Sequence, residues 1–295
     1  MQATKADAWV KPEEWPERWR LPDEDFIPTT LQAGAVSALS AANLYEKISS
    51  TRAVAKSWFS GEMAIGGGPL KVVPDRPGRP PKPVLVPPGH VKRRSLRSDA
   101  GLFAMLHAIA HIELNAVDLA WDIVARFANR GMPRSFFDGW VRVALEEAKH
   151  FSLLQERLAE LGGAYGDLDA HDGLWEAAQS TDHSLTARLA VVPLILEARG
   201  LDVTPALITQ LEEIGDQRTL RIFKIIYRDE QGHVAVGAKW FRFLCAREGV
   251  DPVATFQKLV RTHFRGALKP PFNHAARARA GLTPQFYRAL SSLSR

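Results

Sequence analysis

Apolar residues recur along most of this chain every three or four positions, which is the spacing of an amphipathic α-helix. No segment alternates apolar and polar residues in the way that a half-buried strand does. The pattern is strongest in four long segments and predicts helices over about 99–129, 134–161, 184–199 and 205–247. We therefore expect an all-α protein in which these helices form a four-helix bundle.

Glycine and proline residues predict where these helices bend or end. Gly162-Gly163 and Gly200 follow the second and third segments, as helix-ending residues commonly do. Pro193 lies inside the third segment and predicts a kink, and Gly215-Asp216 can divide the fourth segment in two. Residues 162–186 then form a crossover that contains one short helix.

The chain continues well beyond the four helices on both sides. Tryptophan, proline and acidic residues in 1–29 predict an extended arm, and Thr30 can cap a helical stretch that runs toward Trp58. Residues 61–98 hold too many prolines and glycines for a continuous helix. Another helix is expected at 251–265, and a short one after Thr283. We predict three parts: residues 1–98 packed on the bundle, the bundle at 99–250, and a C-terminal helical extension at 251–295.

Two segments of the chain repeat one arrangement of acidic residues and histidines. Glu113 is followed 34 residues later by Glu147-Ala-Lys-His150, and Glu197 is followed 33 residues later by Glu230-Gln-Gly-His233. Positions i and i+3 share a helix face, so each Glu-x-x-His motif presents a carboxylate and an imidazole together. Apolar residues surround Glu113, Glu147 and Glu230 within about 40° on a helical wheel, which places these acids at the centre of buried faces.

A buried ionised carboxylate must be neutralised, paired or bound to a metal, because its desolvation costs several kcal/mol. Lysine and arginine are scarce on these apolar faces. Two divalent cations would balance four carboxylates, and neutral imidazoles would complete the coordination. Two single-Glu helices and two Glu-x-x-His helices are the ligand set of a di-metal carboxylate bundle. We predict two metal ions, iron in preference to manganese, bound by Glu113, Glu147, His150, Glu197, Glu230 and His233.

Some of these ligand assignments have rivals within the sequence. Glu146 and Asp229 directly precede the motif acids, although the apolar phasing favours Glu147 and Glu230. Glu197 is the least secure ligand, because Pro193 leaves the phase of its helix open.

Further polar residues lie near the predicted ligands in the sequence. His107, His111 and Asp118 share a side of their helix that is roughly 120–160° from Glu113. We expect a buried structural network there rather than a substrate site. Tyr227, one turn before Glu230, is either a core tyrosine, a residue close to the metals or a redox-active phenol. All four are kept as residues that could surround the metal ligands.

Composition and charge bear on the cellular location of the protein and on the kind of partner it can bind. The single cysteine, Cys245, cannot form an intramolecular disulfide, and the N-terminus lacks the apolar core of a signal peptide. The longest apolar run, Leu189–Leu196, is far shorter than the roughly 20 residues that span a bilayer. We expect a cytoplasmic protein that does not enter the membrane. The net charge of +5 permits an anionic partner, but the basic groups at 92–97 and at Arg277 and Arg279 read as solvated loops.

The chain resembles the ferritin-like di-iron superfamily, and most closely a bacterial family within it that is known only as a domain of unknown function. The similarity rests on motifs that cover most of the chain: Pro77-Gly-Arg-Pro80, His107-Ala-Ile-Ala-His111-Ile-Glu113, Glu146-Glu147-Ala-Lys-His150-Phe, Tyr165-Gly-Asp, His171-Asp-Gly-Leu-Trp175, Glu197-Ala-Arg-Gly-Leu-Asp202, Asp229-Glu230-Gln-Gly-His233-Val and Pro270-Pro-Phe-Asn273. This resemblance implies a ferritin-like bundle with a di-iron centre at the six residues named above, and it implies no substrate. A more distant relative is the group of tRNA-hydroxylating di-iron monooxygenases.

Three functions are compatible with such a centre. The first is a dioxygen-dependent oxygenase or oxidase that hydroxylates or desaturates an unidentified small molecule, an RNA or a modified base, with electrons from an external donor because no flavin or nicotinamide motif occurs. The second is iron storage or peroxide detoxification, which the long N-terminal extension disfavours. The third is a metal-stabilised scaffold without activity. A homodimer is compatible with all three.

Overall fold

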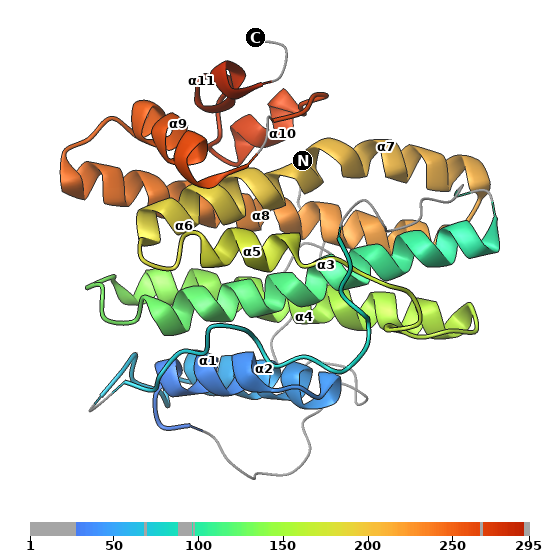
Figure 1. Cartoon of the computed structure of the whole chain (residues 1–295), viewed down its shortest axis with the longest axis horizontal. Helices are drawn as coiled ribbons and strands as arrows, with labels where there is room; N and C mark the ends of the chain where they lie inside the picture. Colours follow the sequence, from blue (N-terminus) through green and yellow to red (C-terminus); the bar gives the residue numbers. More distant parts are fainter. Residues whose placement is uncertain (1–27, 68–69, 88–95, 97, 266–267, 292–295) are drawn as a thin grey trace, which may run out of the picture.

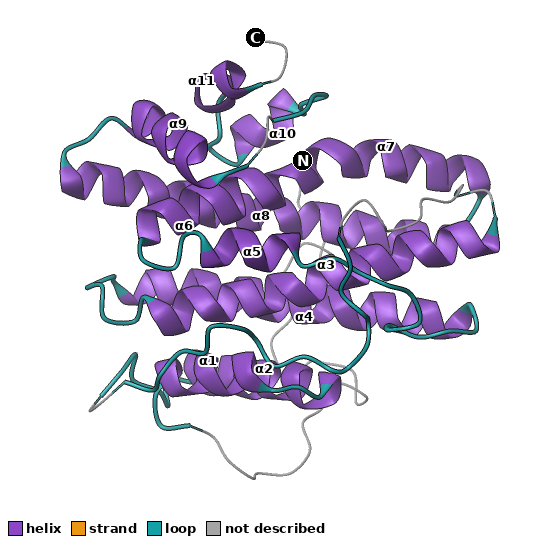
Figure 2. Cartoon of the chain, in the orientation of Figure 1, coloured by secondary structure: helices purple, strands orange, loops and turns teal. Residues whose placement is uncertain are grey.

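The computed structural model describes residues 28–67, 70–87, 96, 98–265 and 268–291, and in this part of the chain it is all-α (Figure 2). The described residues contain no strand, only isolated bridges such as the one between Leu85 and Ala170. The expectation of an all-α helical bundle is therefore confirmed. The helices are α1 (Leu31–Ser40), α2 (Leu44–Phe59), α3 (Asp99–Arg126), α4 (Arg134–Glu160), α5 (Gly173–Gln179), α6 (Leu185–Val191), the π-helical η5 (Val192–Glu197), α7 (Ala198–Ile214), α8 (Gln217–Glu248), α9 (Pro252–His263), α10 (His274–Arg279), α11 (Pro284–Tyr287) and the short η6 (Arg288–Leu290).

The long helices α3 and α4 form the centre of the molecule and run side by side (Figure 1). Their observed bounds agree closely with the predicted 99–129 and 134–161. The side chain of Ser98 caps α3 by accepting a hydrogen bond from the backbone N–H of Gly101. Helix α4 packs also against α8, and α8 packs against η5 and α7, which completes the bundle.

The third and fourth predicted helices have different bounds from those expected. The third helix does not end at Gly200: after a π-helical turn it continues as α7 to Ile214, so 205–214 belongs to this helix and not to the fourth. A glycine inside a helix costs only about 1 kcal/mol, which the packing of α7 on α8 can offset. Helix α7 ends at Gly215, which adopts the left-handed φ of 82° that is typical of a helix C-terminus. Asp216 then caps the N-terminus of α8.

The kink expected at Pro193 takes the form of the π-helical segment η5. Proline lacks the N–H that would continue the α-helical ladder, and the wider π turn accommodates that loss. Gly237 of α8 faces the proline ring so closely that a Cβ there would lie 2.5 Å from the Cβ of Pro193. The close crossing of η5 and α8 therefore depends on glycine at this position. Glu197 is the last residue of η5.

The segments outside the bundle cover two of its sides (Figure 1). The helical stretch expected from Thr30 to Trp58 is two helices, because Asn43 starts α2 by accepting hydrogen bonds from the N–H groups of Tyr45 and Glu46. These helices pack against α3 and α4, whereas α9 and α10 pack against the α8 side. The predicted arm at 1–29 lies outside the described residues except for its last two. The three-part division of the chain stays a prediction.

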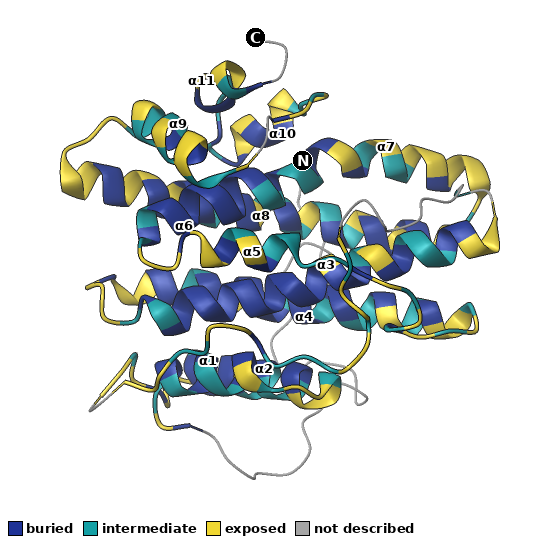
Figure 3. Ribbon diagram, in the orientation of Figure 1, coloured by how far each residue is buried: buried dark blue, intermediate teal, exposed yellow. Residues whose placement is uncertain are grey.

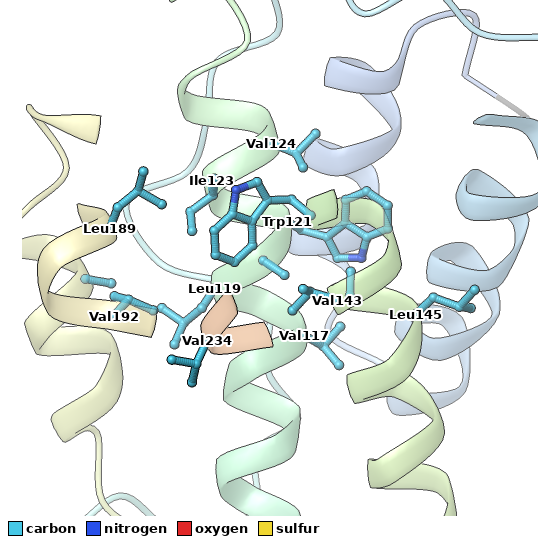
Figure 4. Packing of buried hydrophobic residues seen from close by; sticks show 14 of the residues in the cluster. Val117, Leu119, Trp121, Ile123, Val124, Val143, Leu145, Leu189, Val192 and Val234 are labelled. Carbon is cyan, nitrogen blue, oxygen red and sulfur yellow. The ribbon is translucent and has the colours of Figure 1, made fainter. Parts of the chain in front are cut away.

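The buried core runs along the middle of α3 and α4 (Figure 3). Figure 4 shows Trp121, Val117 and Leu119 of α3 between Val143 of α4 and Val234 of α8. Of the helices described, α3 is long and apolar enough to cross a membrane by length and composition, with a mean hydropathy of 1.4 in its most apolar window. Of that window, 61% is buried inside the fold, so packing already uses its apolar character.

Candidate metal centre

The bundle brings together acids and histidines from three different helices. Helix α3 supplies Glu113, α4 supplies Glu147 and His150, and α8 supplies Glu230 and His233. One ligand atom from each of Glu113, Glu147, His150 and Glu230 lies within 4.8 Å of the other three. All five side chains are buried, with Glu147 and His150 fully inaccessible to solvent. Residues that are up to 120 positions apart in sequence therefore share one buried polar cluster.

Glu147 lies between the two imidazoles and contacts both. Nδ1 of His150 is 3.3 Å from Oε2 of Glu147 and 3.0 Å from Oε2 of Glu113. Nδ1 of His233 is 2.9 Å from Oε1 of Glu147 and 3.9 Å from Oε1 of Glu230. The central carboxylate thus contacts the imidazoles of both Glu-x-x-His motifs.

Glu197 reaches this cluster from the end of η5. It lines the same cavity as Glu113 and Glu230, and its pKa responds to the charges of His233 and Glu147. The sequence left its helical phase open because of Pro193, and the π turn brings it to the site. All six predicted ligands are accordingly in or beside one cluster.

Several buried polar atoms of the cluster have no hydrogen-bond partner among the described residues: Glu147 Oε1, Glu197 Oε2, Glu230 Oε2 and His233 Nδ1. The short contact between His233 Nδ1 and Glu147 Oε1 is an ion-pair distance without the alignment of a hydrogen bond. Burying an unsatisfied polar atom costs about 1–3 kcal/mol, and such atoms are rare in native folds. Their concentration at one place is explained if they are metal ligands.

The other nitrogen of each histidine contacts an acid on the opposite helix. Nε2 of His150 on α4 is 3.1 Å from Oδ2 of Asp229 on α8, and Nε2 of His233 on α8 is 2.8 Å from Oε2 of Glu146 on α4. A carboxylate behind a metal-binding imidazole orients the ring and makes it a better ligand. Glu146 and Asp229 were rivals to the motif acids in the sequence, and the structure gives them this different position. Lys149 Nζ lies 2.5 Å from the same Asp229 oxygen.

The acids and histidines strongly perturb one another's pKa. Burial, and then the negative charge of Glu147, raise the pKa of Glu113 to about 8. Burial also raises the pKa of Glu197 to about 7 and that of Glu230 well above its usual value. Burial lowers the pKa of His233, but the carboxylates of Glu147, Glu146 and Glu230 together outweigh it, so the net pKa is well above the ordinary value. Without metal, the raised pKa values favour protonated acids and histidines, which reduces the net negative charge of the cluster.

This donor set fits divalent metal ions. Four carboxylates and two imidazoles are the ligands that iron and manganese accept, and two M²⁺ ions would neutralise the four acids. The imidazole Nδ1 atoms face the carboxylates, while their Nε2 atoms are occupied by Asp229 and Glu146. The buried group that could bind a metal is thus present in the fold.

The other four polar residues singled out in the sequence bind elsewhere. The hydroxyl of Tyr227 accepts a hydrogen bond from Asn273. His107 accepts one from the backbone N–H of Gly166, and Nδ1 of His111 lies 2.8 Å from the hydroxyl of Tyr165. Asp118 is paired with the buried Lys47 at 2.5 Å. His107, His111 and Asp118 therefore form buried polar contacts on a side of α3 other than that of Glu113.

Sequence reasoning missed the partners of that network. Lys47 of α2 and Arg79 of the proline-rich segment both lie close to Asp118. The sequence carries no distinct signal for Lys47, because the same helix carries Glu46, Arg52 and Lys56, and only the structure shows that Lys47 is fully buried. The interpretation of Arg277 as a solvated basic group is wrong: it is buried and forms two hydrogen bonds, 2.7 and 2.8 Å long, to Asp202. Its burial follows from the packing of the C-terminal segment on α7, which the sequence does not reveal.

An apolar cavity of about 170 Å³ adjoins the cluster. Glu113, Glu197 and Glu230 form part of its wall, and the rest of the wall is mainly aliphatic side chains of α3, α7 and α8. Neither histidine of the cluster is among the lining residues. The cavity therefore meets the cluster on its carboxylate side.

Comparison with known proteins identifies the family. The sequence profile of the family described as "Protein of unknown function (DUF455)" matches residues 40–288. A protein of Haemophilus influenzae named "Uncharacterized protein" is 44% identical over 209 residues, which cover 69% of this chain and 73% of that protein. No solved structure matches the chain. Because the profile spans most of the sequence, including all six predicted ligands, this chain belongs to the DUF455 family.

Proposed function

We propose that this chain is a ferritin-like di-iron carboxylate protein that oxidises a substrate with dioxygen. The observation that carries the proposal is the buried cluster in which Glu147 lies between His150 and His233. Oε2 of Glu197 and Oε2 of Glu230 have no partner there, and Glu147 Oε1 meets His233 Nδ1 only at an ion-pair distance without hydrogen-bond alignment. A purely structural network would pair these atoms, because leaving them unpaired costs stability. Buried polar atoms without partners are typical of places where a bound ion or a reaction needs them.

Each ligand has a distinct part in the proposal. Glu113, Glu147, His150 and Glu230 would supply ligands from one compact group, and Glu197 and His233 would add ligands beside it. Asp229 and Glu146 keep the imidazoles turned so that Nδ1 points at the cluster. Two ferrous ions, when bound, supply the electrons and the binding position that dioxygen needs.

The protein's own contribution is a dry, preorganised site. The carboxylates are held by buried helices, so their geometry does not depend on mobile loops. Core side chains such as Val117 and Val234 keep the interior free of bulk water. Protons that leave the ligands as metal binds can pass to the partly exposed Glu146.

The proposal extends to the partners of the protein. Sustained turnover requires an external electron donor, and a cytoplasmic location would supply one together with ferrous iron. Dimer formation and recognition of RNA through the basic groups are further hypotheses. Iron rather than manganese is proposed because mixed carboxylate and imidazole ligation with open positions suits dioxygen chemistry.

Metal analysis of protein purified without oxygen tests the proposal. The wild type should contain about two iron atoms per chain, whereas Glu147→Gln should lose most of both because it removes the carboxylate that contacts both imidazoles. Glu213→Gln, an exposed position on α7, is the matched control and should keep the full content. Two manganese atoms would retain the site and contradict iron, and a metal-free wild type with intact helicity would refute the centre. Substrate-dependent uptake of dioxygen by the iron form then separates an oxidase from a storage protein.

A further inference from the structure

The wall of the cavity beside the cluster is almost entirely hydrocarbon. Besides the three glutamates, its polar residues are Thr204 and Arg199. Arg199 is already engaged, because its guanidinium donates to the carbonyl oxygens of Lys269 and Pro271 at 2.7 and 3.2 Å. The apolar lining residues are Ile109, Ile112, Ala116, Leu119, Leu174, Leu196, Val203, Leu207, Phe223 and Ile226, with Gly200 among them.

From this lining we infer that the cavity is the substrate site and that it takes an uncharged apolar molecule, or the apolar group of a larger one, of about six to eight carbon atoms. The inference rests on the proposed function and adds the chemical class of its substrate. The size follows from the volume, since a cavity of roughly 150 Å³ lined by aliphatic and aromatic side chains binds benzene. The present cavity is slightly larger, at about 170 Å³.

The position of the cavity supports a reacting group rather than a structural void. Glu113, Glu197 and Glu230 line it, and the last two each have a buried Oε2 atom without a hydrogen-bond partner. A group that fills the cavity therefore stands directly against the carboxylate side of the proposed metal centre. Gly200 adjoins the same place, where a Cβ would lie 3.9 Å from the carboxyl group of Glu230.

The cavity also has an apolar way in. Ile112 of α3 and Val203 of α7 both line it, and 41% and 42% of their surfaces are exposed. Their exposure places an opening between these two helices. An apolar chain can enter there without passing a charged group that needs a partner.

The same lining disfavours a polar or anionic substrate inside the cavity. A nucleobase carries several hydrogen-bonding groups, and each one buried without a partner costs at least about 1 kcal/mol. A carboxylate or phosphate would meet three glutamates against a single lining cation, Arg199, whose Nη1 already contacts two backbone carbonyls and the carboxylate of Asp202. A modified base could therefore enter only through an apolar substituent.

Fluorobenzene is a suitable test molecule, with 4-fluorobenzoate as its charged counterpart, and fluorine NMR measures the binding of each to the full-length protein. Fluorobenzene should bind saturably and 4-fluorobenzoate at least about tenfold more weakly. Ala116→Leu fills the cavity and should weaken fluorobenzene binding by about tenfold or more. Ala108→Leu makes the same change at an exposed position of α3 and should leave binding unaltered. Should Ala116→Leu fail to fold, Leu207→Ala enlarges the cavity and should shift the preference toward fluoronaphthalene.

Different results overturn different parts. Absence of fluorobenzene binding, equal binding by the two leucine variants, or tighter binding of 4-fluorobenzoate would each overturn the substrate class. Metal content measured on the same samples shows whether the cavity inference or the proposed di-iron centre has failed. Bound metal without fluorobenzene binding rejects the cavity inference alone, whereas fluorobenzene binding without metal supports the apolar site and rejects the di-iron centre.

Discussion

Nε2 of His150 lies 3.1 Å from Oδ2 of Asp229 on the facing helix, and Nε2 of His233 lies 2.8 Å from Oε2 of Glu146 in the reverse direction. Helices α4 and α8 thus each carry a Glu-x-x-His motif and an acid that contacts the histidine of the other. The acid that precedes each motif glutamate does not serve its own histidine. The two halves of the centre are consequently coupled through the packing of α4 on α8.

Removing one of these orienting acids should weaken metal binding while the six ligands stay in place. Asp229→Asn is expected to reduce affinity for ferrous or manganous ion by about 10–100-fold, because the imidazole of His150 loses its anionic partner. Titration against a chelator of known affinity measures the change. Glu212→Gln, on the exposed surface of α7, is the control. Unchanged affinity in Asp229→Asn would show that the contact does not position the ring.

Metal binding should weaken as the pH falls from about 8 to about 6. In the metal-free protein the pKa of Glu113 is raised to about 8, first by burial and then by the charge of Glu147. The pKa values of Glu230, His150 and His233 are also well above normal. Protons occupy these groups below their pKa, so a cation must displace them, and each displaced proton lowers the apparent affinity roughly tenfold per pH unit. Manganese titrations at several pH values measure this slope, and a flat profile would contradict protonated ligands.

Replacing one ligand acid should leave the metal-free protein as stable or more stable. Glu197 is half-buried, but its Oε2 atom is buried without a partner, and burial raises the pKa of the carboxyl group to about 7. Above that pH, Glu197→Gln replaces a desolvated charge with an uncharged side chain of nearly the same shape. The substitution is expected to add about 1 kcal/mol to the free energy of unfolding. Added metal should then stabilise the wild type by mass action and the variant much less.

Thermal unfolding with chelator and with added manganese makes this comparison, and Glu213→Gln on the same helix is the control. A loss of several kcal/mol in metal-free Glu197→Gln would mean that the carboxylate has a structural partner, contrary to the expectation.

The C-terminal segment should stabilise the helix that carries Glu197. Arg277 is buried, and its guanidinium binds both carboxylate oxygens of Asp202 on α7. Arg277→Ala removes the buried guanidinium from Asp202, which keeps only the N–H of Asn273 and a 3.5 Å contact with Arg199, and should cost about 3–5 kcal/mol in urea unfolding. Arg279→Ala removes only contacts of 3.3–3.4 Å between exposed groups and should cost about 0.5 kcal/mol or less. Equal losses in the two variants would contradict the assignment.

The ligand inventory could be predicted from the sequence because it depends on local geometry. A glutamate and a histidine three positions apart share a face in any α-helix, so Glu147 with His150 and Glu230 with His233 follow from the helical pattern alone. The limits of α3 and α4 follow closely from apolar periodicity and, at the end of α4, from Gly162-Gly163.

What the tertiary structure decided are the contacts between segments that are distant in sequence. Gly200 could end a helix on local grounds, yet α7 continues through it because its packing on α8 outweighs a cost of about 1 kcal/mol. The partners of Asp229 and Glu146 depend on which helix lies opposite, and the burial of Arg277 depends on where the C-terminal segment docks. The apolar cavity exists only between helices, so no single stretch of sequence encodes it.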